Sequence, residues 1–134
     1  METTTPRRQT LRKTERLHEK KAIEALMAEG KSIPLPPFRV IWTVGEGKVE
    51  PPVKVLFTVP KRNFKRAVDR NLLKRRMREA YRKNKYILCG TAETAMKHYN
   101  IMFVYTSKDK QVYRDIESKI VIALQRLADK TNGK

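Results

Sequence analysis

A strongly basic segment near the middle of the chain limits what the chain can fold into. Between residues 61 and 85 it carries twelve basic residues against two acidic ones, Asp69 and Glu79. Apolar residues recur in this segment at the spacing of three and four that is typical of a helix, so we predict a helix over residues 67–85. Because burying unpaired charge is costly, an apolar core cannot surround this helix. Its basic side must face solvent or a polyanion, and the polyanion we expect is RNA.

The composition of the whole chain agrees with this expectation. Its 134 residues include 31 Lys and Arg against 14 Asp and Glu, which gives a formal charge of +17. Such a charge predicts salt-sensitive attraction to phosphate backbones. A hydrophobic content of 40% suffices for one ordinary core. We therefore predict a mobile lead over residues 1–10, a single RNA-binding domain over residues 11–130 and a short tail over residues 131–134.

Several classes of protein are disfavoured by the same sequence. It has no apolar run long enough to span a membrane and no apolar signal core near its first residues, so we expect a cytoplasmic protein with no membrane partner. Its single cysteine, Cys89, cannot form an internal disulfide, and we interpret it as a small apolar residue. With only His18 and His98 beside that cysteine, no zinc cluster of familiar spacing can be assembled. We therefore predict no metal site in the protein.

Hydrophobic periodicity outlines the remaining elements. An apolar stripe predicts a first helix over residues 11–28, ended by Gly30, and three prolines predict an extended connector over residues 32–37. Alternating residues predict strands over 38–44 and 53–59, paired as an antiparallel hairpin. A short strand over 101–105, reached through a loop that holds Gly90, and a last helix over 113–129 follow. These elements predict an α+β fold, a two-layer sandwich of a small mixed β-sheet with helices packed on it, in the order α-β-β-(β)-α-β-α.

The basic helix has two distinct sides. The apolar residues within one arc of about 100° are Leu73, Met77, Ala80 and Tyr81, and we expect them to pack on the sheet. The neighbouring arc carries Asn71, Lys74, Arg75, Arg78 and Arg82. A merely solvated helix surface usually mixes charges of both signs, because like charges one turn apart weaken a helix. The one-sided charge therefore favours contacts with phosphates.

At residues 59–82 the sequence VPKRNFKRAVDRNLLKRRMREAYR resembles the signature of the protein subunit of bacterial ribonuclease P. The resemblance departs at Leu72, where the family usually has arginine. It implies that an RNA subunit carries the active site and holds Mg²⁺, while the protein assists removal of the 5′ leader from precursor tRNA. It also implies a left-handed βαβ crossover. The residues that we expect to contact RNA are Lys61, Arg62, Lys65, Arg66, Arg70, Asn71, Lys74, Arg75, Arg78 and Arg82.

The resemblance further implies a cleft for the leader between the first helix and the open face of the sheet. The candidate residues for this cleft are Ile23, Met27, Phe38, Ile41, Lys54 and Thr58. Ile23 and Met27 stand where family members often carry aromatic residues, on a helix that we predict to be about two turns longer than in the family. Two interpretations of Ile23 and Met27 therefore stay open, contact with leader bases or simple filling of the core.

Catalysis by the protein's own side chains is disfavoured. A protein nuclease needs clustered carboxylates that hold metals or a positioned acid–base pair. The three predicted strands contain no Asp or Glu, and neither His18 nor His98 has an evident partner. Two alternatives to ribonuclease P stay open, a ribosomal or general RNA-binding protein and a DNA-binding protein. DNA binding through a helix-turn-helix is disfavoured because strands flank the basic helix.

Overall fold

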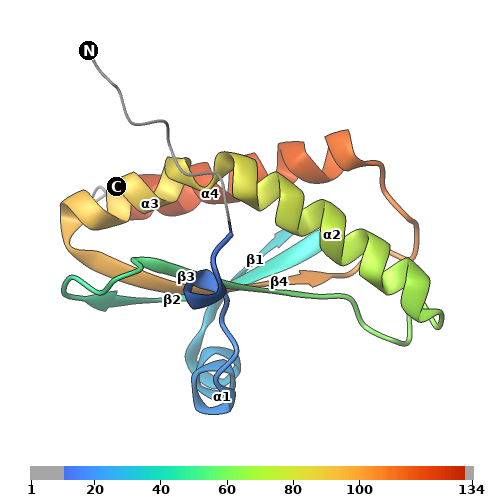
Figure 1. Ribbon diagram of the computed structural model, residues 1–134, viewed down its shortest axis with the longest axis horizontal. Coiled ribbons are helices and arrows are strands. Elements are labelled where there is room, and N and C mark those ends of the chain that lie inside the picture. Colours follow the sequence, from blue (N-terminus) through green and yellow to red (C-terminus); the bar gives the residue numbers. More distant parts are fainter. Residues whose placement is uncertain (1–10, 132–134) are drawn as a thin grey trace.

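The computed structural model describes residues 11–131 and has a mixed α+β fold built on one four-stranded sheet, as predicted. The elements in chain order are η1 (Lys13–Glu15), α1 (Lys20–Glu29), β1 (Lys31–Leu35), β2 (Phe38–Glu46), β3 (Val53–Thr58), α2 (Ala67–Asn84), α3 (Tyr86–Ala95), β4 (Lys97–Tyr105) and α4 (Tyr113–Thr131). Figure 1 shows α2, α3 and α4 together on one face of the sheet and α1 on the other. The sheet therefore separates two surfaces that differ in what covers them.

The strand order is β1-β2-β4-β3. β2 pairs antiparallel with both β1 and β4, whereas β3 pairs parallel with β4. The predicted hairpin of residues 38–44 with residues 53–59 is therefore wrong, because β4 lies between the two strands. Ile101, Met102 and Phe103 are all buried, so both faces of β4 are covered and its place in the middle of the sheet suits its apolar sequence. The parallel pair, joined through α2 and α3, forms the βαβ unit that the resemblance implies.

The first helix is shorter than predicted, since α1 begins at Lys20 rather than at residue 11. The preceding residues form the short 3₁₀-helix η1 and then an extended segment that begins at Arg16, in which Arg16 is exposed and Leu17 is buried. The N–H of Leu17 donates to the carbonyl of Val55 at 2.9 Å, and Arg16 forms a parallel bridge with Val55. The helix is therefore not extended by two turns, because this segment pairs with the free edge of β3.

Two other elements were not predicted, because proline and glycine in their sequences indicated irregular structure. The predicted connector over residues 32–37 largely belongs to β1, which accepts Pro34 because it is an edge strand with one unpaired side. The predicted loop around Gly90 contains α3, a helix that ends at Met96 in the left-handed conformation with φ 57°. β4 then begins at Lys97, four residues before the predicted strand.

The remaining boundaries differ from the predictions by one or two residues, as is usual for the ends of elements. α4 continues through Thr131, which is buried, so the predicted tail loses its first residue to the helix. The rest of that tail and the predicted lead over residues 1–10 lie outside the described residues.

The two faces of the sheet are packed separately. On the side of α2 and α4, Val40, Val55 and Phe103 belong to the large core cluster. On the side of α1, a smaller cluster of Leu17, Leu26 and Met102 is buried, with Ile23, Ile41 and Leu56 partly covered around it. Because successive strand residues point to opposite faces, each strand contributes to both clusters. The face beneath α1 is thus only partly closed.

Candidate nucleic-acid interface

α2 docks on the sheet through the apolar side that its sequence predicts. Leu73, Met77, Ala80 and Tyr81 are all fully buried. The ring of Tyr81 meets the ring of Phe57 on β3 edge-on, with 5.9 Å between centroids. Burial of this apolar side holds the helix against the sheet, so its basic side points outward.

Most of the predicted RNA-contact residues carry no internal ion pair. Among residues 11–131, the following side chains have no hydrogen bond or salt bridge to another protein group: Lys61, Arg62, Lys65, Arg66, Asn71, Lys74, Arg75 and Arg78. All eight are exposed or half-exposed. The two acidic residues of the segment are occupied elsewhere, because Asp69 pairs with Lys110 at 3.2 Å and Glu79 pairs with Arg82 and Lys83. Charge on this side of α2 is therefore not neutralised within the described structure.

The side chain of Arg70 is hydrogen-bonded within the protein. Its Nη1 donates to the carbonyl oxygens of Phe64 and Lys65, both at 2.8 Å. These bonds hold the loop over residues 59–66 against the first turn of α2. The basic residues of that loop, Lys61, Arg62, Lys65 and Arg66, are thereby kept next to the helix.

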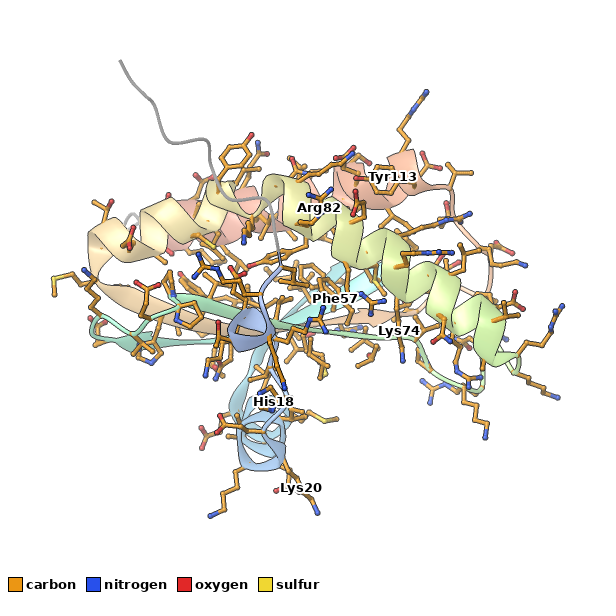
Figure 2. All side chains as sticks on the ribbon, in the orientation of Figure 1. His18, Lys20, Phe57, Lys74, Arg82 and Tyr113 are labelled. Atoms are coloured by element: carbon orange, nitrogen blue, oxygen red, sulfur yellow. The ribbon has the colours of Figure 1, made fainter. Side chains whose placement is uncertain are left out.

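Arg82 is also engaged. Its Nη2 and Nε donate to the Glu79 carboxylate at 2.5 and 3.0 Å. These hydrogen bonds raise the pKa of Arg82 and lower the pKa of Glu79. Figure 2 shows Arg82 beside Tyr113 of α4, on a different side of α2 from Lys74. Arg82 is therefore set apart from the other predicted contact residues.

A shallow hollow of about 480 Å³ lies on the basic side of α2. It is lined by Val68, Asn71, Leu72, Arg75 and Arg78. Leu72, which stands where the family usually has arginine, forms part of its apolar wall. Burial is the first cause of a lowered pKa of Arg78, and the charges of Arg16 and Arg75 lower it further. Arg16 was not among the predicted contact residues, because its position in the predicted first helix gave no sign that it lies near α2.

The predicted leader cleft is brought together only in part. Ile41, Lys54 and Thr58 lie on the sheet face that carries α1. Ile23 packs partly into the small cluster on that face, whereas Met27 is 66% exposed and fills no core.

The placement of Phe38 in this cleft is wrong. Phe38 is 1% exposed and belongs to the large core on the opposite face, where its ring meets Phe103 edge-on at 5.4 Å. The alternation that places Ile41 in the cleft puts Phe38 with Val40 and Trp42 on the other face.

One basic residue of the segment points inward. Lys85 Nζ lies 2.8 and 3.0 Å from the two carboxylate oxygens of Glu15, and both side chains are 10% exposed. Glu15 also accepts the backbone N–H of Arg12 at 2.7 Å. This pair fastens the segment that precedes α1 to the junction of α2 and α3.

Other reactive groups are few in the described part of the chain. Within it, no three His, Cys, Asp or Glu side chains are grouped to hold a metal ion. His98 Nδ1 lies 3.2 Å from the carbonyl oxygen of Gly47, and His18 is exposed. Burial raises the pKa of the Cys89 thiol to about 11. No helix in residues 11–131 is both long enough and apolar enough to cross a membrane.

The fold and this surface define a small α+β protein in which one helix, docked by its apolar side, presents an unneutralised basic side. A family model described as Ribonuclease P matches residues 11–128, and the chain belongs to that family. It is 34% identical over 125 residues to a ribonuclease P protein component of Porphyromonas gingivalis, covering 93% of this chain and 91% of the relative.

Solved structures share the fold. The ribonuclease P protein of Thermotoga maritima is similar with a TM-score of 0.64 and 23% identity, over 84% of this chain and 96% of that one. A Staphylococcus aureus ribonuclease P protein mutant with defective mRNA degradation activity is similar with a TM-score of 0.65 and 19% identity, over 87% of this chain and 90% of that one. These likenesses confirm the mixed α+β architecture.

Proposed function

We propose that this chain is the protein component of the ribonuclease P ribonucleoprotein. In this role it binds the catalytic RNA and the 5′ leader of precursor tRNA, and it assists the endonucleolytic cut that gives the mature tRNA 5′ end. One observation carries the proposal: in a chain of this family, α2 is buried on one side, and Lys74, Arg75 and Arg78 on its basic side have no acidic partners among the described residues. The cytoplasm, which holds both RNAs, is the compartment we expect.

The proposed mechanism is electrostatic and positional. Arg75 and Arg78 offer planar guanidinium groups that can donate two parallel hydrogen bonds to a phosphate. Each neutralised phosphate releases condensed counterions, so several contacts give high affinity with a steep dependence on salt. The protein thus reduces the repulsion between the catalytic RNA and its substrate.

A separate surface is proposed for the leader. Ile41, Lys54 and Thr58 on the sheet, with Met27 on α1, offer apolar and polar contacts on the face that α1 covers only partly. Such a surface suits single-stranded RNA, which binds through base contacts together with backbone charge. Ile23 supports this surface from the small cluster beneath it.

We place the chemistry of cleavage in the RNA subunit, which in this proposal also holds most of the Mg²⁺. The side chains of the described residues offer no grouped metal ligands, so they do not fit a protein-held Mg²⁺ ion. What this chain contributes is charge that partly substitutes for added cations.

This division of labour predicts a shift in the Mg²⁺ requirement. With the protein present, the catalytic RNA is expected to reach half-maximal cleavage of precursor tRNA at several-fold lower Mg²⁺ concentration than without it. The advantage should be larger for a substrate with a leader of several nucleotides than for one whose leader is a single nucleotide. Cleavage rates measured across a Mg²⁺ titration test this, and superimposable curves with and without protein would contradict it.

A further inference from the structure

We propose that Arg16, Arg75 and Arg78 together form a binding site for a backbone phosphate of RNA. The inference rests on the proposed function and adds to it a residue that lies outside α2 and outside the signature over residues 59–82. It also links two surfaces, because Arg16 precedes the helix that borders the leader cleft.

The backbone of Arg16 is held in place on both sides. Arg16 is bridged to Val55, and the next residue, Leu17, donates its N–H to the Val55 carbonyl. Leu17 is 2% exposed in the cluster beneath α1, and Glu15 is buried against Lys85. The backbone is extended from Arg16 onward, and neighbouring residues of an extended segment point to opposite sides, so Arg16 is directed outward while Leu17 is anchored inward. Because this backbone is already ordered, binding through the Arg16 side chain costs little backbone conformational entropy.

The two partners of Arg16 come from one face of α2. Arg75 and Arg78 are three positions apart in the sequence, so they are neighbours on the helix surface. The strand to which Arg16 is bridged is the one on which α2 docks, through the contact between Phe57 and Tyr81. Burial is the main cause of the lowered pKa of Arg78, and the positive charge of Arg16 lowers this pKa further. Arg16 and Arg78 therefore lie near each other. The three cations therefore belong to one local cluster.

This cluster lacks a counter-charge in the described structure. None of Arg16, Arg75 and Arg78 forms an ion pair or hydrogen bond through its side chain with any of residues 11–131. Grouped like charges repel, and the repulsion is relieved when an anion binds among them. Three guanidinium groups offer more parallel donors than a carboxylate can accept, whereas a phosphodiester bridged between them suits their geometry.

The position of the cluster identifies the class of phosphate. It borders the hollow lined by Asn71, Arg75 and Arg78 on the side proposed for the catalytic RNA. It also adjoins the extended segment that leads into α1, on the side proposed for the leader. A phosphodiester of either RNA has the same chemistry, so the test must separate the two sources.

The test compares Arg16→Ala with Lys13→Ala, an equal change of charge three residues away at an exposed position. Binding to the catalytic RNA is measured across a salt series, for the RNA alone and with precursor tRNA that carries or lacks a leader. Loss of one phosphate contact predicts about tenfold weaker binding for Arg16→Ala and a salt slope smaller by about 0.9. Lys13→Ala should change neither. Arg16→Lys should keep the slope and lose part of the affinity, because it retains the charge but not the fork.

The outcomes separate the inference from the proposed function. A loss seen with the catalytic RNA alone assigns the phosphate to that RNA, and a loss seen only with leader-bearing precursor assigns it to the leader. Equal binding by Arg16→Ala and Lys13→Ala, while Arg75→Ala binds weakly, would overturn the inference alone. If Arg75→Ala also binds like the wild type, the proposed function fails as well. Thermal unfolding of each variant shows that the fold is kept.

Discussion

The Arg75→Ala/Arg78→Ala variant is expected to bind the catalytic RNA about 100-fold more weakly than the wild type, or weaker still. In the proposed function each arginine would make charge-assisted hydrogen bonds to phosphate worth about 1.5 to 3 kcal/mol, and about 1.4 kcal/mol corresponds to a tenfold change in affinity. The slope of log affinity against log salt should fall by about 2, since two phosphates regain their counterions. Equilibrium binding across a salt series measures both quantities.

The matched control is Arg114→Ala/Arg126→Ala on α4. Both of these arginines are exposed, and the variant has the same net charge as the α2 variant. If binding depends on the basic side of α2, this control should lose little affinity. Equal losses in the two double variants would mean that overall charge, not this helix side, governs binding. Neither double variant removes a buried side chain, so both should melt near the wild-type temperature.

Lys85→Met is expected to lower the free energy of unfolding by about 3 to 5 kcal/mol, the usual cost of leaving one partner of a buried ion pair without the other. The side chains of Glu15 and Lys85 are each 10% exposed, and both carboxylate oxygens of Glu15 lie within 3.0 Å of Lys85 Nζ. Glu15→Gln should show a similar loss, because it removes the charge while the amide oxygen can still accept the Arg12 N–H. Urea denaturation measures these changes.

The double variant Glu15→Gln/Lys85→Met distinguishes an ion pair from simple packing. With neither charge present, no buried ion lacks a partner, so most of the stability lost in either single variant should return. Losses that simply add in the double variant, or single losses below about 1 kcal/mol, would show that water reaches the pair.

Local periodicity predicted the part of the fold that depends on one element at a time. The buried side of α2 follows from helical spacing, and Leu73, Met77, Ala80 and Tyr81 are buried as predicted. Strand pairing joins residues far apart in the chain, and the alternation of β2 and β3 is compatible with either a hairpin or an intervening strand. The order of the strands in the sheet could therefore not be predicted from the sequence. Gly90 and Pro34, read as signals of irregular structure, lie in a helix and an edge strand, because tertiary packing outweighs their propensities.

The candidate site was predictable to a similar degree. Residues on the outer side of α2 could be identified from spacing and charge. The carbonyl partners of Arg70 and the extended backbone around Arg16 could not, since both depend on contacts with another segment. The resemblance implied Phe38 and Ile41 together in one cleft, whereas the alternation of β2 sets these two residues on opposite faces of the sheet.

The most direct test of the central claim is to locate the RNA around the protein. Val68→Cys, at the hollow on α2, would carry a tethered iron chelate that generates hydroxyl radicals, and Met96→Cys, at the turn between α3 and β4, would serve as the control. The native residues are 59% and 57% exposed, and Figure 1 shows that turn at the opposite end of the molecule from the start of α2. Cys89 is half-buried and its pKa is raised to about 11, so at pH 8 its thiol stays protonated and takes up little reagent. We predict strong cleavage of the catalytic RNA at a few positions from residue 68 and little from residue 96, whereas equal or reversed cleavage would contradict binding through α2.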